Sequence, residues 1–201
     1  MRFGTIGAGT IATALARHAI KAGYAVTLSN SRGPGTLGDL VAELGPLASA
    51  GTVAEAAQGD IVFLAVGYLQ VPDALEGIVD FGGRILVDTT NQFQLIDGEY
   101  APLDLGEQTG SEVVASHAPG ARVIKAFNTL YAGFIEPDPR HEAGRQVVFY
   151  AGDDADAKKT VHGVLDEFGF APVDVGDLRD GGRLMQVDGG FLSALHVLKQ
   201  D

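Results

Sequence analysis

Two glycines and an alanine near the start of the chain have the spacing of a phosphate-binding turn. Gly7, Gly9 and Ala12 follow the apolar run Arg2–Ile6 and open an alanine-rich segment. Gly7 would permit a tight turn, Gly9 would let the backbone approach a pyrophosphate, and Ala12 would let the helix pack against the strand. The N-terminus of that helix would offer free N–H groups to the phosphates. The pattern predicts dinucleotide binding; the alternative is a glycine-rich turn without a ligand.

Asn30, Ser31 and Arg32 stand where a dinucleotide-binding chain would place a carboxylate. An acid at this position accepts hydrogen bonds from the ribose 2′-hydroxyl of NAD, but residues 23–38 contain none. A carboxylate would repel a 2′-phosphate, whereas the planar fork of Arg32 and hydrogen bonds from Asn30 and Ser31 would hold it. The stretch favours NADP over NAD; the alternative is that Arg32 is an ordinary solvated loop arginine.

Three later apolar runs end in small or polar residues that could line the same crevice. Ligands of open α/β sheets bind at the carboxyl ends of the strands, which selects the ends of the runs 60–66, 84–90 and 121–127. Small and apolar residues there suit contacts with a ribose or a ring, and asparagines suit recognition of an amide or a carbonyl. The contacts expected from these ends are Ala65, Val66, Gly67, Asn91 and Asn128.

Lys125 and Asn128 are the candidate catalytic residues. A lysine at a strand end could polarise a carbonyl or bind an anionic group of a substrate. It could equally pair with Asp88 and only support the loop, and the sequence leaves both readings open. For Asn128 we favour a functional role. Asp88 is interpreted as a cap of the loop that follows it, and Tyr68 as either a packing aromatic or a ring-stacking side chain.

The elements that must position these residues alternate between strands and helices. Short β-branched runs separated by helical patterns predict an α/β fold, a Rossmann doubly wound and mainly parallel sheet with helices on both faces. We expect one NADP-binding domain over 1–201, with 1–128 as the dinucleotide-binding core and 129–201 as a small C-terminal α/β extension. Strands are expected at 2–6, 25–29, 48–50, 60–66, 84–90, 121–127, 146–152 and 172–176, helices at 10–22, 37–44, 53–57, 71–79, 107–117, 154–168 and 182–199, and loops at 91–106 and 131–144.

The composition limits the classes of protein that fit. The absence of cysteine excludes disulfides, thiolate metal sites and cysteine nucleophiles. The five histidines lack metal-ligand spacing, so no metal is expected, and His18 and His162 are expected on helix surfaces. A net charge of -12 argues against a nucleic-acid partner. No apolar run reaches the roughly 18 residues of a membrane span, and the first residues resemble a strand more than a signal peptide, so we expect a cytoplasmic protein.

Several segments carry a resemblance to a known family. They are "IGAGTIATAL", "SNSRGP", "DIVFLAV", "VDTTNQF", "VIKAFNTL" and "YAGDDADAKKTVHGVLDEFGFAPVDVGDL", which together span nearly the whole chain. The sequence resembles the NADP-dependent oxidoreductases related to the F420H2:NADP+ oxidoreductases. The resemblance implies a Rossmann domain with a small C-terminal extension, hydride transfer between NADP and a deazaflavin, and NADP bound at Gly7, Gly9, Thr10, Ile11, Ser31 and Arg32. The sequence departs from that family at residues 67–69, where a proline-containing segment is often found, and at Asn128, where the deazaflavin reductases carry histidine.

Three functions fit these features. The first is hydride transfer between NADPH and a planar small-molecule acceptor such as coenzyme F420 or a flavin, which suits a chain without an obvious acid/base pair. The second is reduction of a small carbonyl or imine in the manner of β-hydroxyacid dehydrogenases or pyrroline-carboxylate reductases, with Lys125 and Asn128 catalytic; the alternating C-terminal segment disfavours it. The third is a non-catalytic NADP(H) sensor. The apolar C-terminal residues could be core, cover a planar substrate, or form the face of a homodimer; they are Leu184, Met185, Leu192 and Leu195.

Overall fold

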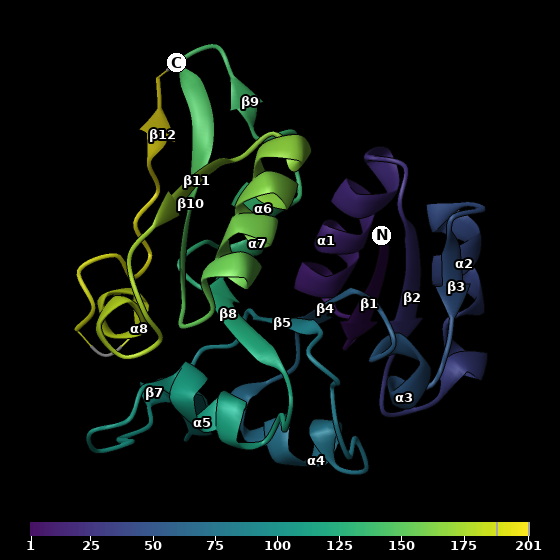
Figure 1. Cartoon of the computed structure of the whole chain (residues 1–201), viewed down its shortest axis with the longest axis horizontal. Helices are drawn as coiled ribbons and strands as arrows, with labels where there is room; N and C mark the ends of the chain where they lie inside the picture. The colour runs from purple at the N-terminus through teal and green to yellow at the C-terminus, as the bar shows by residue number, and fades with distance from the viewer. Residues whose placement is uncertain (188, 201) are drawn as a thin grey trace.

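The computed structural model describes residues 1–187 and 189–200 and places most strands in one sheet (Figure 1). The strand order is β11-β10-β8-β5-β4-β1-β2-β3. Neighbouring strands from β3 to β8 are parallel, β10 is antiparallel to β8, and β11 is parallel to β10. The expected Rossmann-like α/β fold is confirmed. The strands are β1 (Arg2–Ile6), β2 (Ala25–Ser29), β3 (Ala48–Ala50), β4 (Ile61–Leu64), β5 (Ile85–Asp88), β8 (Arg122–Ala126), β10 (Gly144–Gly152) and β11 (Ala171–Asp174).

Helices cover both faces of the sheet (Figure 1). One core lies between the sheet and α1, α6 and α7, and receives Phe63 and Val87. The other lies between the sheet and α4 and α5, and receives Val62 and Leu86. Because β4 and β5 are covered on both sides, they are continuously apolar until the final Asp88. The helices are α1 (Thr10–Lys21), α2 (Gly38–Leu44), α3 (Val53–Ala56), α4 (Val71–Leu75), α5 (Gly110–Ser116), α6 (Ala132–Ile135), α7 (Ala155–Phe168) and α8 (Asp180–Met185), with short 3-10 turns η1 (Pro34–Thr36) and η2 (Tyr68–Gln70).

The expectation of a loop over 91–106 is wrong. The segment forms a hairpin of β6 (Phe93–Ile96) and β7 (Glu99–Pro102), which pair antiparallel. Asp97 and Gly98 connect the strands and both have positive φ, 52° and 87°. Asp-Gly is a strong signal for a two-residue hairpin turn of this kind, because its two central residues need positive φ.

The expectation of a helix over 182–199 is also wrong. α8 ends at Met185, and the chain then turns and returns to the sheet as β12 (Leu198–Lys199), which pairs with β10. The helix ends because Gln186, directly after Met185, has an extended backbone with φ -71° and ψ 143°.

Smaller differences concern the ends of elements. The expected helix at 71–79 stops at Leu75, because Glu76 is extended and Gly77 has φ 84°. The expected loop at 131–144 contains α6 and the short strand β9 (Arg140–His141). The extension after residue 128 shares the sheet with the preceding core, since β10 is hydrogen-bonded to β8.

His18 is buried, which corrects its expected place on a helix surface. It lies on the inner face of α1, where Nε2 is 2.6 Å from the Ile135 carbonyl oxygen and the ring stacks on Phe168. Burial lowers the pKa of His18 below its ordinary 6.5, although the hydrogen bond to Ile135 opposes this shift. His162 is exposed, as expected.

The buried His18 predicts a loss of stability in acid. Above pH 6.5 the ring is neutral in both states, whereas below it the unfolded chain takes up a proton that the folded chain resists. The free energy of unfolding should therefore fall from pH 6.5 towards the lower folded-state pKa, by at most about 1.4 kcal/mol per pH unit. Urea unfolding across this range measures the slope. His18→Gln, which can still donate to Ile135, should flatten it, whereas substitution of the exposed His117 by glutamine should not; equal slopes in both variants would contradict the assignment.

Candidate functional site

The turn between β1 and α1 contains two glycines with different surroundings. The fold requires glycine at Gly7, whereas the space beside Gly9 is empty. Gly7 has φ 109°, and a Cβ on it would lie 2.2 Å from the Ala65 carbonyl oxygen. A Cβ on Gly9 would meet no heavy atom within 4 Å, so the packing of the chain itself does not require glycine there. α1 begins without a side-chain cap and without an acid in its first turn. This cradle fits a pyrophosphate held by the free N–H groups at the start of a helix.

Arg32 lies in the loop after β2, whose last residue, Ser29, accepts a hydrogen bond from the Gly7 N–H at 3.1 Å. The Asn30 side chain is used internally: Oδ1 accepts from the Arg32 N–H at 3.0 Å, and Nδ2 donates to Thr36 Oγ1 at 2.9 Å. Ser31 and Arg32 are exposed, and within residues 1–187 and 189–200 no hydrogen bond or ion pair engages the Arg32 guanidinium. Asn30 thus shapes the loop, and Ser31 and Arg32 are exposed side chains with the chemistry to bind an anion.

The segment that follows β4 forms the next part of the edge. Ala65 and Val66 are half-buried, and Gly67 is exposed with its N–H bonded to the side chain of η2 residue Gln70. Tyr68 is buried among apolar side chains, and its hydroxyl is 3.5 Å from the Gly110 carbonyl oxygen. Burial, with the nearby charge of Asp88, raises the pKa of Tyr68 to about 12. These residues offer a small, mostly apolar wall.

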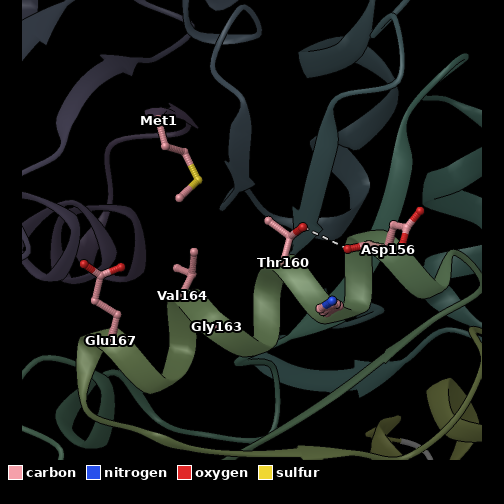
Figure 2. A pocket seen from close by; sticks show the side chains of 7 residues that line it. Met1, Asp156, Thr160, Gly163, Val164 and Glu167 are labelled. Carbon is pink, nitrogen blue, oxygen red and sulfur yellow. Dashed lines mark hydrogen bonds between the residues drawn. The ribbon is translucent and has the colours of Figure 1, made fainter.

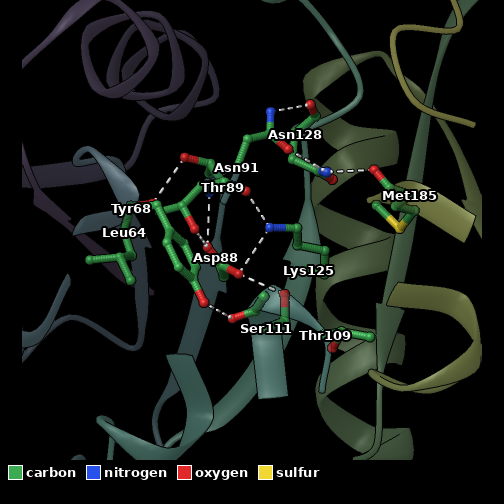
Figure 3. Close-up of polar contacts among 12 residues, drawn as sticks. Leu64, Tyr68, Asp88, Thr89, Asn91, Thr109, Ser111, Lys125, Asn128 and Met185 are labelled. Atoms are coloured by element: carbon green, nitrogen blue, oxygen red, sulfur yellow. Dashed lines mark hydrogen bonds and ion pairs between the residues drawn. The ribbon is translucent and has the colours of Figure 1, made fainter. Parts of the chain in front are cut away.

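Asn91 and Asn128 meet, although 37 residues separate them (Figure 3). Asn91 Nδ2 donates to the Asn128 carbonyl oxygen at 2.9 Å, and Asn128 Nδ2 donates to Asn91 Oδ1 at 3.0 Å. Asn128 Nδ2 also donates to the Met185 carbonyl oxygen at 2.9 Å, which brings the end of α8 to the site. The remaining oxygen, Asn128 Oδ1, is buried and has no partner in the described part of the chain.

Phe127, between Lys125 and Asn128, has an unusual backbone. It lies in the left-handed region, with φ 66°, and its ring is buried edge-on against Phe63 and Phe170. A bulky residue in this conformation is uncommon and stores strain that the surrounding packing must hold. Nothing in the local sequence indicates it, and it sets the direction in which Asn128 leaves β8.

Lys125 is buried and bonded to Asp88. Their charged atoms are 3.0 Å apart, and Lys125 also donates to the Thr90 carbonyl oxygen (Figure 3). Of the two interpretations that the sequence leaves open, this placement favours support of the loop. Asp88 also accepts from the Thr90 N–H at 2.8 Å, the contact of a residue that caps the following loop.

Other features of the molecule lie away from this edge. A hollow of about 550 Å³ lies between the start of the chain and α7. Figure 2 shows side chains that line it. Met1, one of its lining residues, precedes β1, so the hollow lies where the parallel strands begin, opposite the candidate site. Across residues 1–187 and 189–200 no three His, Asp or Glu side chains are grouped to hold a metal ion. The same residues include no helix with the length and apolarity needed to cross a membrane.

Comparisons with known proteins identify the family. Residues 2–92 match the family described as NADP oxidoreductase, coenzyme F420-dependent. The crystal structure of hypothetical protein SMa0349 from Sinorhizobium meliloti has a TM-score of 0.91 and 38% identity, covering 100% of this chain and 96% of that one. A candidate F420-dependent NADP reductase from Arthrobacter sp. FB24 has a TM-score of 0.79 and 25% identity, covering 89% and 86%. The chain belongs to this family of NADP-dependent oxidoreductases.

A curated relative is longer than this chain. The metalloreductase STEAP3 of Rattus norvegicus is 30% identical over 180 residues, which cover 88% of this chain and 34% of that protein. The chain therefore spans about a third of the length of the curated relatives it matches. The match to these relatives is therefore limited to the part that the two chains share.

Proposed function

We propose that the protein binds NADPH at the carboxyl edge of the sheet and transfers hydride between it and a planar acceptor, such as a deazaflavin or a flavin. One observation carries this proposal. At this edge Arg32 is exposed and its guanidinium has no partner among the described residues, whereas the other two charged groups, Asp88 and Lys125, are buried and bonded to each other. Such a site can hold and orient NADPH, but it presents neither group as a proton donor to a substrate.

We assign successive segments along this edge of the sheet to different parts of NADPH. The backbone at Gly7, Gly9, Thr10 and Ile11 would hold the pyrophosphate, and Ser31 and Arg32 would hold the 2′-phosphate. Asn30 is better placed to fix the loop than to touch the cofactor, since both ends of its amide are used. Bound NADPH would supply the hydride.

The nicotinamide end would lie over Ala65, Val66 and Gly67, beside the two asparagines. The unpaired and buried Asn128 Oδ1 would accept a hydrogen bond from an amide such as a carboxamide N–H. Asn128 is thus our candidate for the catalytic residue that touches the reacting rings, with Asn91 holding it in place.

Exposed apolar residues at and after the end of α8 support a planar acceptor. The hydrogen bond to Met185 places the end of α8 at the site, and the neighbouring Leu184 is 39% exposed. Leu184 accepts a hydrogen bond from the Leu192 N–H at 2.9 Å, which brings Phe191, 88% exposed, to the same region. A flat aromatic ring would cover these side chains, and its delocalised charge would need no positioned acid.

The alternative of a small carbonyl or imine reductase requires a proton donor. Lys125 is 4% exposed and bonded to two acceptors, and Tyr68 has a raised pKa and a buried ring. Both placements favour hydride transfer without a dedicated acid.

A panel of acceptors tests the proposal. We expect oxidation of NADPH, followed by its absorbance, with coenzyme F420 or a flavin, slow or absent oxidation with a ketone or cyclic imine, and weak activity with NADH. Turnover of the imine alone, abolished by Lys125→Met, would support the carbonyl or imine alternative instead. Tight binding of NADPH without turnover of any acceptor would make the protein a sensor.

A further inference from the structure

A buried ion pair lies beneath the strand ends proposed to face the nicotinamide. Asp88 Oδ2 and Lys125 Nζ are 3.0 Å apart, and their side chains are 0% and 6% exposed (Figure 3). Burying two charges costs free energy that packed apolar side chains of similar volume would avoid. A gain in stability is therefore a poor explanation for this ion pair. The positions in which it holds neighbouring residues explain it better.

The contacts of the pair converge on the segment that follows β5 and on α5. Asp88 Oδ1 accepts hydrogen bonds from the N–H and the hydroxyl of Thr90, at 2.8 and 2.7 Å. Asp88 Oδ2 accepts from Ser111 Oγ at 2.6 Å as well as from Lys125. Lys125 donates a second hydrogen bond to the Thr90 carbonyl oxygen. Thr90 is therefore held at its N–H, its hydroxyl and its carbonyl.

Fixing Thr90 also fixes the next residue, Asn91. The preceding residue is held too, because Thr89 Oγ1 donates to the Leu64 carbonyl oxygen at 2.9 Å. Asn91 is hydrogen-bonded in both directions to Asn128, so the two asparagines form one unit. Hydride transfer depends steeply on how two rings are placed, and an error of about 1 Å can lower a rate about 100-fold.

We infer that Asp88, Lys125 and Ser111 form a positioning clamp that holds Thr90 and thereby aims the Asn91–Asn128 pair at the nicotinamide. Lys125 is then a positioning residue and does not transfer a proton. The inference rests on the proposed function, since the asparagines face a nicotinamide only if NADPH binds at this edge. The clamp itself belongs to the free chain and can be measured without an acceptor.

Ser111→Ala removes one arm of the clamp without leaving a charge unpaired. The matched control is Ser116→Ala, because Ser116 is on the same helix, is exposed, and donates to the Val113 carbonyl within that helix. We expect S111A to speed amide hydrogen exchange at residues 89–91 about 10-fold over wild type and S116A. In single turnovers, S111A should slow hydride transfer about 10- to 100-fold, with less than about a threefold change in the NADPH dissociation constant.

A second variant combines Asp88→Asn with Lys125→Met, so that neither charge is left buried alone. It should reproduce the loss of rate in S111A and keep the shape of the pH–rate profile. Loss of one limb of that profile would make Lys125 a proton donor and overturn the inference. Wild-type exchange at residues 89–91 in S111A would overturn it as well. If the wild type reduces no acceptor, the proposed function fails, but the exchange measurement still decides whether the clamp exists.

Discussion

Replacing Gly9 with valine is expected to weaken NADPH binding about 100-fold or more without unfolding the protein. The backbone of Gly9 is extended, with φ -83°, and a Cβ there meets no heavy atom within 4 Å, so the free chain accommodates a side chain. The same space is where we propose that the pyrophosphate reaches the start of α1. A 100-fold change corresponds to about 2.7 kcal/mol. Titration followed by NADPH fluorescence measures the affinity, and thermal unfolding of the free protein measures the stability.

Gly7→Ala provides the contrast. Its positive φ and the Ala65 carbonyl oxygen 2.2 Å from the added Cβ should destabilise the fold itself, by about 3 kcal/mol or more, before any ligand is added. The Gly7 variant would then lose stability, whereas the Gly9 variant would lose affinity for NADPH. A Gly9→Val protein that binds NADPH like wild type, or that melts as early as Gly7→Ala, would refute the assignment of this turn.

Arg32→Ala should raise the dissociation constant of NADPH about 30- to 100-fold and that of NADH less than about threefold. Hydrogen bonds between a guanidinium and a phosphate contribute about 2 to 3 kcal/mol, and NADH lacks the 2′-phosphate that would receive them. Because the described chain gives the Arg32 guanidinium no partner, its removal should leave the unfolding temperature unchanged. Parallel titrations with the two cofactors measure the selectivity.

Lys159→Ala is the control for this change in net charge. Lys159 is exposed on α7 and lines the hollow at the opposite edge of the sheet, so both dissociation constants should stay within about twofold. Arg32→Lys should fall between wild type and alanine, since an ammonium keeps the charge but loses the planar fork. Equal weakening of NADPH and NADH in the alanine variant would place the 2′-phosphate elsewhere.

The part of the site that we propose for the phosphates can be predicted from the sequence because local constraints define it. β1 and β2 are short apolar runs with the predicted bounds, and the turn after β1 needs glycine at Gly7 whatever else the chain does. The hairpin at 93–102, where we expected a loop, could also have been predicted from the sequence, since Asp97 and Gly98 are the residues that a two-residue hairpin turn requires.

The nicotinamide end depends on contacts between residues far apart in the chain, which a single sequence does not reveal. Asn128 meets Asn91 and the Met185 carbonyl, 37 and 57 residues away. Ser111 reaches Asp88 only because α5 begins beside the end of β5. The left-handed conformation of Phe127 likewise follows from the packing of its ring, against the preference of its residue type.

The aromatic core has a consequence for how the protein is made. The ring centroid of Phe3, in β1, lies 5.9 Å from that of Phe168, near the end of α7, and that of Phe127 lies 5.6 Å from Phe170. A ribosome delivers the chain from its N-terminus, so the glycine turn after β1 emerges long before α7 can cover β1. Because α1 covers only part of this face of the first strands, we expect the rest of the face to stay in contact with water until residues 161–170 appear. The amino-terminal half, which carries this glycine turn, thus reaches its final packing only after the carboxyl-terminal half has been made.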